Sequence, residues 1–226
     1  MSTTIYQDKQ SPWSSHSRIL SMIEALPASS KVLDVGTASG MLARRNRNTS
    51  LRFFGIEAVA DWADAASPYY EKLWACPFDD APLEALSGYN AVVMGDVLEH
   101  MSAPDAALKK LVELQPAGCK FFISVPNVAN IWARLNLFMG RFDYTERGIL
   151  DQTHLRFFTK KTITSLVKKS GLEIISIQAT PIPLELVSSF FTSTLGRFFH
   201  AVLAGLTSIF PTLFGYQFIV EAIKHE

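Results

Sequence analysis

Short apolar runs alternate with stretches of helical periodicity from residue 31 to residue 122. This alternation is typical of β-α-β units arranged around a parallel sheet. Two more strand-like runs follow nearer the carboxyl end of the chain. The predicted strands are Val32–Val35, Leu51–Ile56, Lys72–Ala75, Ala91–Met94, Lys120–Ser124, Leu172–Ala179 and Tyr216–Lys224.

Two of the helices between these strands are clearly marked. Pro104 suits the first turn of helix Pro104–Leu114. Thr159 is the expected cap of helix Thr159–Ser170, which follows a long polar and aromatic connection at residues 140–158. The other predicted helices or helical turns are Ser17–Leu26, Met41–Arg47, Val59–Ala66, Pro82–Leu86 and Asn127–Phe138.

The segment Leu184–Phe214 is rich in Phe and Leu and carries almost no charge. Gly196, Gly205 and Pro211 interrupt it, so it lacks the roughly 20 continuous apolar residues that a membrane span needs. We expect two short helices here instead. They could pack on the sheet, on a second copy of the chain in a homodimer, or on a membrane surface, although no alternating basic face is present to attract anionic lipid.

The length and charge of the chain narrow the classes of function. A chain of 226 residues favours one domain with an elaboration. The formal net charge of zero argues against a nucleic-acid partner. Cys76 and Cys119 match no metal-ligand spacing and are expected to be free thiols in a reducing compartment. Because the N-terminus does not resemble a secretory signal, we expect a cytoplasmic protein, with membrane association left open.

The stretch KVLDVGTASG, residues 31–40, is the most informative motif. A β-branched run leads directly into a turn bounded by Gly36 and Gly40, which suits a backbone that passes close to a nucleotide-like ligand. The dinucleotide fingerprint would need a glycine at Ala38, and no Lys-Ser or Lys-Thr pair follows to make a phosphate-binding loop. Both of those cofactor classes are therefore disfavoured.

Acidic or small residues stand at or just beyond the ends of four predicted strands. Asp34 belongs to the first strand, Glu57 ends the second, Asp79 follows the third, and Gly95 with Asp96 follows the fourth. Parallel strands present their carboxyl ends at one edge of the sheet, where such folds bind ligands. Glu57 could accept both hydroxyls of a ribose there, and Asp79 could accept an adenine amino group.

With these motifs the chain resembles the class I S-adenosylmethionine-dependent methyltransferases. The resemblance lies in VLDVGTASG, in Glu57, in the FDD turn and in GDVLEHM. The LEH triplet is typical of a bacterial subgroup that includes relatives of quinone O-methyltransferases and glycan-cluster enzymes. The run DQTHLRFFT, residues 151–159, is similar to a run in the glycan-associated members. Ala38 is a departure, because many members have glycine there.

The resemblance implies a Rossmann-like, doubly wound α/β fold. Its seven-stranded sheet would be mostly parallel with an antiparallel last strand, and a helical insertion would lie between the last two strands. The whole chain, 1–226, would be one methyltransferase domain with a helical cap at 1–30, a cofactor-binding core at 31–125, acceptor-side helices and a loop at 126–170, and the apolar insertion at 184–214.

The resemblance also implies S-adenosyl-L-methionine as cofactor and S-adenosyl-L-homocysteine as product. Methyl transfer would go to an oxygen, or less readily a nitrogen, of a small molecule, sugar or lipid-linked glycan. The alternative is a non-catalytic module that binds a partner or a membrane through the insertion. The cofactor-binding residues implied are Asp34, Gly36, Thr37, Ala38, Gly40, Glu57, Ala58, Phe78, Asp79, Asp80, Gly95, Asp96 and Val97.

Two histidines are candidates for the general base that an oxygen acceptor would use. His154 lies in the connection expected to cap the site, and His100 follows the fourth strand. Either could instead be a packing or anchoring residue. Glu99 beside His100 could contribute to a divalent cation site, as in some quinone methyltransferases, but one carboxylate and one imidazole are an incomplete ligand set, so no metal is predicted.

Polar residues after the fifth strand could line an acceptor pocket. Guanidinium groups suit carboxylate or phosphate, so a sugar phosphate or a lipid-linked glycan is a conceivable acceptor. Arginines in a loop can equally face solvent and bind nothing. The acceptor-binding candidates are Asn127, Arg141, Tyr144 and Arg156, with Arg147 as a further member.

Overall fold

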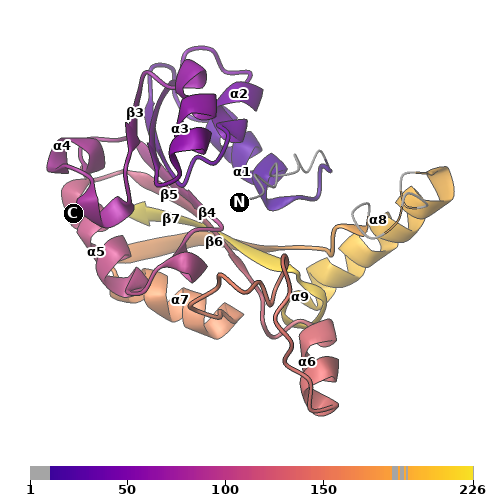
Figure 1. Cartoon of the computed structure of the whole chain (residues 1–226). Coiled ribbons are helices and arrows are strands. Elements are labelled where there is room, and N and C mark those ends of the chain that lie inside the picture. The colour runs from indigo at the N-terminus through magenta and orange to yellow at the C-terminus, as the bar shows by residue number, and fades with distance from the viewer. Residues whose placement is uncertain (1–10, 185–187, 189–190, 192, 226) are drawn as a thin grey trace.

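The computed structural model describes residues 11–184, 188, 191 and 193–225. A seven-stranded sheet runs through the molecule in the order β3-β2-β1-β4-β5-β7-β6 (Figure 1). β7 pairs antiparallel with both β5 and β6, and the other pairs are parallel. The strands are β1 Lys31–Val35, β2 Arg52–Glu57, β3 Lys72–Ala75, β4 Ala91–Gly95, β5 Lys120–Pro126, β6 Leu172–Thr180 and β7 Gln217–Lys224.

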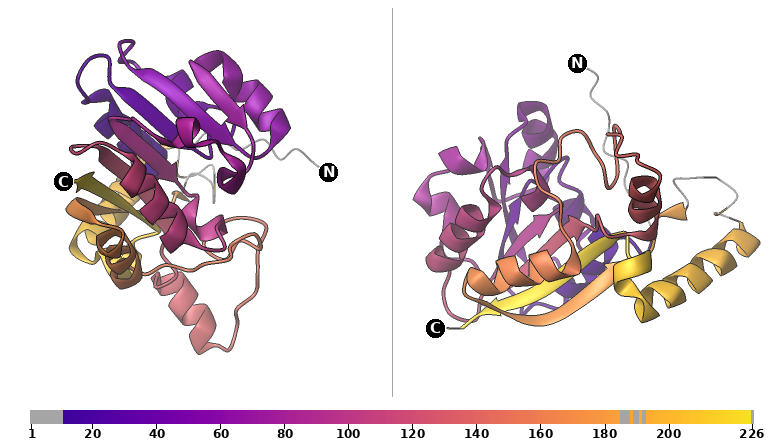
Figure 2. Two further views of the ribbon diagram at one scale, coloured as in Figure 1. Left: turned by 90° about the vertical axis from the view of Figure 1, so that its left-hand side faces the viewer. Right: turned by 90° about the horizontal axis from the view of Figure 1, so that it is seen from below.

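Helices cover both faces of this sheet, as the views in Figure 2 show. Successive side chains of β1 point to opposite faces of the sheet, and both faces are apolar: Val32 belongs to one buried cluster and Leu33 to the other. Ile19 and Ile23 of α1 close one face, and α5 and α7 close the other through residues such as Leu108 and Ile163. The helices and turns are α1 Ser15–Glu24, α2 Met41–Arg45, α3 Ala60–Ala66, η1 Ser67–Tyr69, η2 Phe78–Asp80, α4 Leu83–Leu86, η3 Leu98–His100, α5 Pro104–Leu114, α6 Ile131–Phe138, α7 Lys160–Lys169, α8 Thr194–Ile209 and α9 Pro211–Phe214.

The predicted fold is confirmed, including the antiparallel last strand and the helical elements before it. Thr159 caps α7 in a reciprocal capping box with Thr162. The helix expected at Asn127–Phe138 starts later than predicted. α6 begins only at Ile131, because residues 127–130 form a turn and the Asn130 side chain caps the helix by accepting a hydrogen bond from the Trp132 amide.

The apolar insertion also differs from the expected pair of short helices. α8 continues through Gly196 and Gly205 for 16 residues, and only the Pro211 region ends it. Glycine weakens a helix without forbidding it, so the apolar stripe of the helix prevails. Residues 185–187, 189, 190 and 192 of this insertion lie outside the described part of the chain.

α6 and α8 project from the body of the molecule on either side of α9 (Figures 1 and 2). Both expose large apolar side chains. Phe138 at the end of α6 is 90% exposed, and Phe198 on α8 is 62% exposed. Within the described residues, no helix has both the length and the apolar character to cross a membrane.

Candidate functional site at the carboxyl edge of the sheet

Four adjacent parallel strands, β3, β2, β1 and β4, end at one edge of the sheet and bring most of the predicted cofactor residues together. Residues that are far apart in the sequence therefore lie close together at this edge. The cluster contains the β1 turn (Gly36, Thr37, Ala38, Gly40), the end of β2 (Glu57, Ala58), η2 after β3 (Phe78, Asp79, Asp80) and the residues at and after the end of β4 (Gly95, Asp96, Val97).

The turn after β1 depends on left-handed backbone at three positions. Gly36 has φ 74° and Gly40 has φ 76°, and Ala38 between them has φ 46°. A Cβ on Gly36 would lie 2.7 Å from a methyl carbon of Val97, so the β4 loop packs directly on this glycine. Alanine tolerates this region at a cost of about 1–2 kcal/mol, which shows why glycine would be the easier residue at position 38.

The carboxylate of Glu57 holds this turn. One oxygen accepts a hydrogen bond from the Ala38 amide at 2.7 Å, and the other accepts one from the Val59 amide at 2.9 Å. Glu57 is buried, and desolvation raises the pKa of its carboxyl, while the backbone hydrogen bonds act in the opposite direction. A carboxylate has about four acceptor positions, so acceptor capacity remains for a ligand beside the Ala38 and Val59 amides and the nearby Ala58 amide.

Asp34 lies beneath the turn rather than on its surface. It is 2% exposed and accepts a 2.6 Å hydrogen bond from the hydroxyl of Tyr70. Gly55 on β2 makes room for this contact, because a Cβ there would lie 3.0 Å from the Tyr70 ring and 2.7 Å from Thr37. Burial is the main cause that raises the pKa of Asp34 to about 7.

Asp96 connects the end of β4 to the start of β7, two strands away in the sheet. Its backbone has φ 57°, and its carboxylate accepts hydrogen bonds from the Ser124 hydroxyl at 2.6 Å and from the Gln217 amide at 2.7 Å. The start of β7 is thereby tied to the end of β4, although the two residues are 121 positions apart in sequence.

The loop at residues 149–158 folds back over the end of β4. The backbone amides of Leu155 and Arg156 donate to the carbonyl of Glu99 at 2.8 and 3.0 Å, and the Arg156 guanidinium donates to the carbonyl of Ser102. These bonds place His154 next to His100, with their ring centroids 4.9 Å apart. The structure thus brings the two predicted catalytic histidines together.

His154 is buried and its ring is fixed by a backbone contact. Its Nδ1 lies 3.1 Å from the carbonyl oxygen of Ile149, so Nδ1 carries the hydrogen and Nε2 carries the lone pair. Desolvation, followed by the charge of His100, lowers the pKa of His154. The neutral form is therefore favoured.

Asn127 has a structural role that the sequence did not indicate. It is fully buried, and its side-chain NH₂ donates to the carbonyls of Thr212 and Gly215 at 3.0 and 2.8 Å, while its oxygen accepts from the Ala129 amide. These bonds hold α9 against the end of β5. The amide hydrogens of Asn127 are thus already donated to the backbone, and its role in binding an acceptor stays a prediction.

The other acceptor candidates are exposed and lie on the loop from α6 to α7. Arg141 follows directly after the projecting end of α6, and Tyr144 packs edge to face on Phe142. Arg147 is exposed farther along this loop. Arg156 is exposed too, but its bond to Ser102 places it beside η3. Of these residues, Arg156 is the one whose hydrogen bonds, to the carbonyls of Glu99 and Ser102, tie it to the segment after β4.

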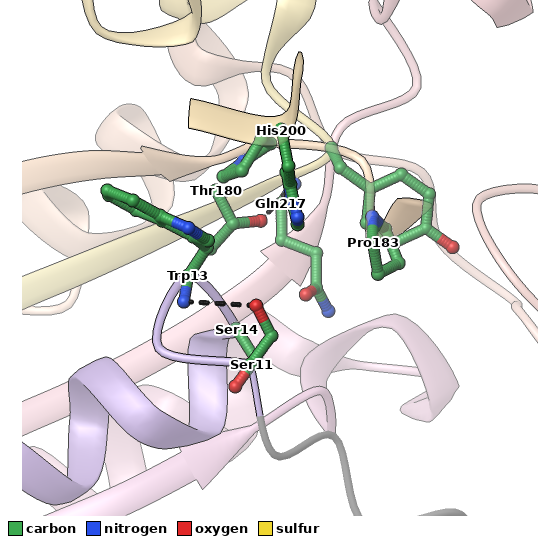
Figure 3. A pocket seen from close by; sticks show the side chains of 9 residues that line it. Ser11, Trp13, Ser14, Thr180, Pro183, His200 and Gln217 are labelled. Carbon is green, nitrogen blue, oxygen red and sulfur yellow. Dashed lines mark hydrogen bonds between the residues drawn. The ribbon is translucent and has the colours of Figure 1, made fainter. Parts of the chain in front are cut away.

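A small pocket beside Asp96 contains residues that the sequence did not single out (Figure 3). Gln217, which binds Asp96, lines it together with Trp13 and His200. Trp13 and His200 come from opposite ends of the chain, with ring centroids 6.5 Å apart. Two features of the sequence could have indicated this pocket: the polar residues at the start of β7 and the single histidine in the apolar helix α8. The pocket is lined by Ser11, Trp13, Ser14, Thr180, Pro181, Pro183, His200, Tyr216 and Gln217.

Comparison with known proteins agrees with this geometry. A protein family described as a methyltransferase domain matches residues 11–177, which is more than half of the chain. The chain belongs to this methyltransferase family. A search among curated protein sequences gave no match.

Solved structures share the fold of this methyltransferase at low sequence identity. A SAM-dependent methyltransferase from Archaeoglobus fulgidus has a TM-score of 0.62 and 15% identity, with 92% of each chain covered. Magnesium protoporphyrin IX methyltransferase from Synechocystis PCC 6803, with bound SAH, has a TM-score of 0.60 and 15% identity, covering 97% of this chain and 90% of that one.

The [4+2]-cyclase SpnF has the same fold, with a TM-score of 0.57, 15% identity, and coverage of 97% of this chain and 86% of its own. The fold therefore accommodates more than one reaction. Residues of the site, rather than the fold, have to support the chemistry of this methyltransferase.

The backbone of the β1 turn generates a paired prediction. Gly36→Ala should lower the free energy of unfolding by about 2 kcal/mol or more, because it adds left-handed strain and a contact with Val97. Ala38→Gly should leave it unchanged or raise it by up to about 1 kcal/mol, because relief of left-handed strain is only partly offset by the entropy of glycine in the unfolded chain. Urea denaturation of both variants measures this. Equal losses in the two variants would contradict the assigned turn geometry.

The buried Asp34 generates a prediction about pH. Its pKa of about 7 in the folded protein lies above that of the unfolded chain, so the stabilising protonated form is lost as pH rises toward 8. Relative to Asp34→Asn, whose amide stays neutral and still accepts from Tyr70, the wild type should lose on the order of 2–3 kcal/mol between pH 5 and pH 8. Urea denaturation at both pH values tests this, with the exposed Asp105→Asn as control. Parallel pH dependences of wild type and Asp34→Asn would exclude it.

Proposed function

We propose that this methyltransferase transfers a methyl group from S-adenosylmethionine to an oxygen, or less readily a nitrogen, of a small molecule, sugar or lipid-linked glycan. The observation that carries the cofactor assignment is the Glu57 carboxylate, bonded to the Ala38 and Val59 amides at the edge where β1 and β2 end. Its remaining acceptor positions suit the two hydroxyls of a ribose.

The rest of the edge supports the same cofactor. The exposed backbone of Gly36 leaves space for the methionine portion beside Val97, and Phe78 with Asp79 after β3 offers an apolar and a polar contact for adenine. The charge of Asp96 lies beyond the end of β4. In this proposal the chain mainly holds two reactants in contact and excludes water.

We assign the acceptor to the side of the site formed by η3 and the loop at residues 149–158. In the transfer, the acceptor oxygen attacks the methyl carbon, the bond from that carbon to sulfur breaks, and S-adenosylhomocysteine leaves. A hydroxyl acceptor also gives up its proton. His154 and His100 stand where they can assist that loss, and Arg156 is the candidate that would orient the acceptor.

The Glu57 contacts give a test of the cofactor. Wild-type protein should bind S-adenosylhomocysteine with a dissociation constant in the micromolar range. Glu57→Ala should weaken binding at least about tenfold, because hydrogen bonds to a charged group contribute about 1.5–3 kcal/mol each. Isothermal titration calorimetry measures both, with the exposed Glu113→Ala as control.

Two results of this titration would contradict the cofactor assignment. If wild-type protein with a cooperative unfolding transition binds no S-adenosylhomocysteine, this proposal fails. If binding occurs but Glu57→Ala binds as tightly as Glu113→Ala, the position of the ribose is wrong.

We further propose that the acceptor is reached at a lipid surface. α8 exposes Leu195, Phe199, Val202 and Leu206 at alternating intervals of four and three residues, which form one apolar stripe. The exposed end of α6 carries Phe138 next to Met139, and Arg141 follows. Apolar residues beside an arginine suit insertion at a membrane interface.

Vesicle flotation tests the lipid contact. Wild-type protein should float with vesicles of phosphatidylcholine and phosphatidylglycerol in equal parts. The double change Phe138→Glu with Phe198→Glu should reduce the bound fraction at least about tenfold, since burial of each ring contributes about 1.5–3 kcal/mol when complete. Leu83→Glu is the matched control, because Leu83 is an exposed apolar residue of α4. A wild type that does not float, but elutes as a dimer that the double change dissociates, would assign the surface to a second copy instead.

A further inference from the structure

We infer that Glu99, His100 and His154 form a binding site for a divalent transition-metal cation. Each residue offers one ligand atom, and these three atoms all lie within 4.8 Å of one another. Sequence alone offered only Glu99 and His100, an incomplete set. Folding of the loop at residues 149–158 over η3 supplies the third ligand.

The chemistry of the three groups matches known cation sites. Two imidazoles and one carboxylate are the protein ligands of catalytic zinc in His₂Glu sites and of non-haem iron, and both kinds of site keep positions open for water or substrate. Metal-bound ligand atoms lie about 3–3.5 Å apart when the bonds are about 2.1 Å long. The trio would therefore have to close slightly, which the exposed side chain of His100 allows.

The surroundings orient the two imidazoles. Nδ1 of His154 faces the carbonyl of Ile149 at 3.1 Å. Nδ1 of His100 faces both the carbonyl and the hydroxyl oxygen of Thr153 at 3.2 Å, and that hydroxyl donates its own hydrogen to Asp151 at 2.7 Å. A hydrogen bond from one ring nitrogen to a carbonyl leaves the lone pair on the other, which is the usual arrangement of a ligating histidine. Two bonds to the Glu99 carbonyl from Leu155 and Arg156 hold the contributing segments together.

The location gives the cation a function in methyl transfer. Glu99 follows Val97 by two residues, and Val97 packs on Gly36 of the proposed cofactor turn. A hydroxyl that binds a divalent cation has a lowered pKa, so its proton passes to water more readily before the oxygen attacks the methyl carbon. This role rests on the proposed function, whereas binding of the cation itself does not.

The test is titration of the protein with Mn²⁺ and with Zn²⁺ after removal of bound metal by a chelator and dialysis. Wild type should bind one ion per chain. His100→Gln and Glu99→Gln should each weaken binding at least about tenfold. His225→Gln is the matched control, because His225 is an exposed histidine that pairs with Glu173 at 2.7 Å.

Replacement of Mn²⁺ by Co²⁺ adds a spectroscopic readout, since visible absorption bands should appear with wild type and be lost with His100→Gln. S-adenosylhomocysteine binding by the same samples separates the two proposals. If the protein binds one ion per chain but no S-adenosylhomocysteine, the metal site is supported and the proposed function is overturned. No ion in wild type, or binding that His100→Gln and Glu99→Gln leave unchanged, would overturn the metal site.

Discussion

The hydrogen bond from the Ala38 amide to Glu57 is the contact on which the geometry of this site depends. It connects the turn after β1 to the end of β2, and the same carboxylate holds the chain where it leaves β2 through Val59. A left-handed residue between two left-handed glycines has little conformational stability of its own, so an acceptor of this strength has to fix it. The Gly36 and Gly40 amides donate to the carbonyls of Ile56 and Thr37, so the Ala38 amide is the part of the turn whose direction Glu57 fixes.

Packing beneath the turn supports this bond. Gly55 lacks a side chain, so Tyr70 can reach Asp34 under the turn, and Thr37 packs against the same glycine. The cost is a buried carboxyl group whose charged form is unfavourable, as the raised pKa of Asp34 shows. The carboxyl groups at Asp34 on β1 and Glu57 on β2 thus have different roles: Asp34 supports the turn from below, and Glu57 faces the proposed ligand.

Much of this half of the molecule could be predicted from the sequence because its determinants are local. β-branched runs, the glycines of the turn and the acidic strand ends are each visible within about ten residues. The direction of strand pairing then places them at one edge without further information. The error about α8 has a different origin. Gly196 and Gly205 predict interruptions of the helix, yet a continuous apolar stripe and a buried face that includes His200 outweigh two glycines in a helix of 16 residues.

The acceptor side could not be predicted in this way, because its contacts join distant parts of the chain. His100 and Thr153 are 53 positions apart, and Asp96 and Gln217 are 121 apart. Asn127 illustrates the consequence: its residue type and place suggested a ligand, whereas the fold uses both of its amide hydrogens to hold α9. The same long-range packing turns the incomplete pair Glu99 and His100 into a trio with His154. Solved structures share this fold, so the features particular to this chain lie in such long-range contacts, several of which join η3 to the loop that covers it.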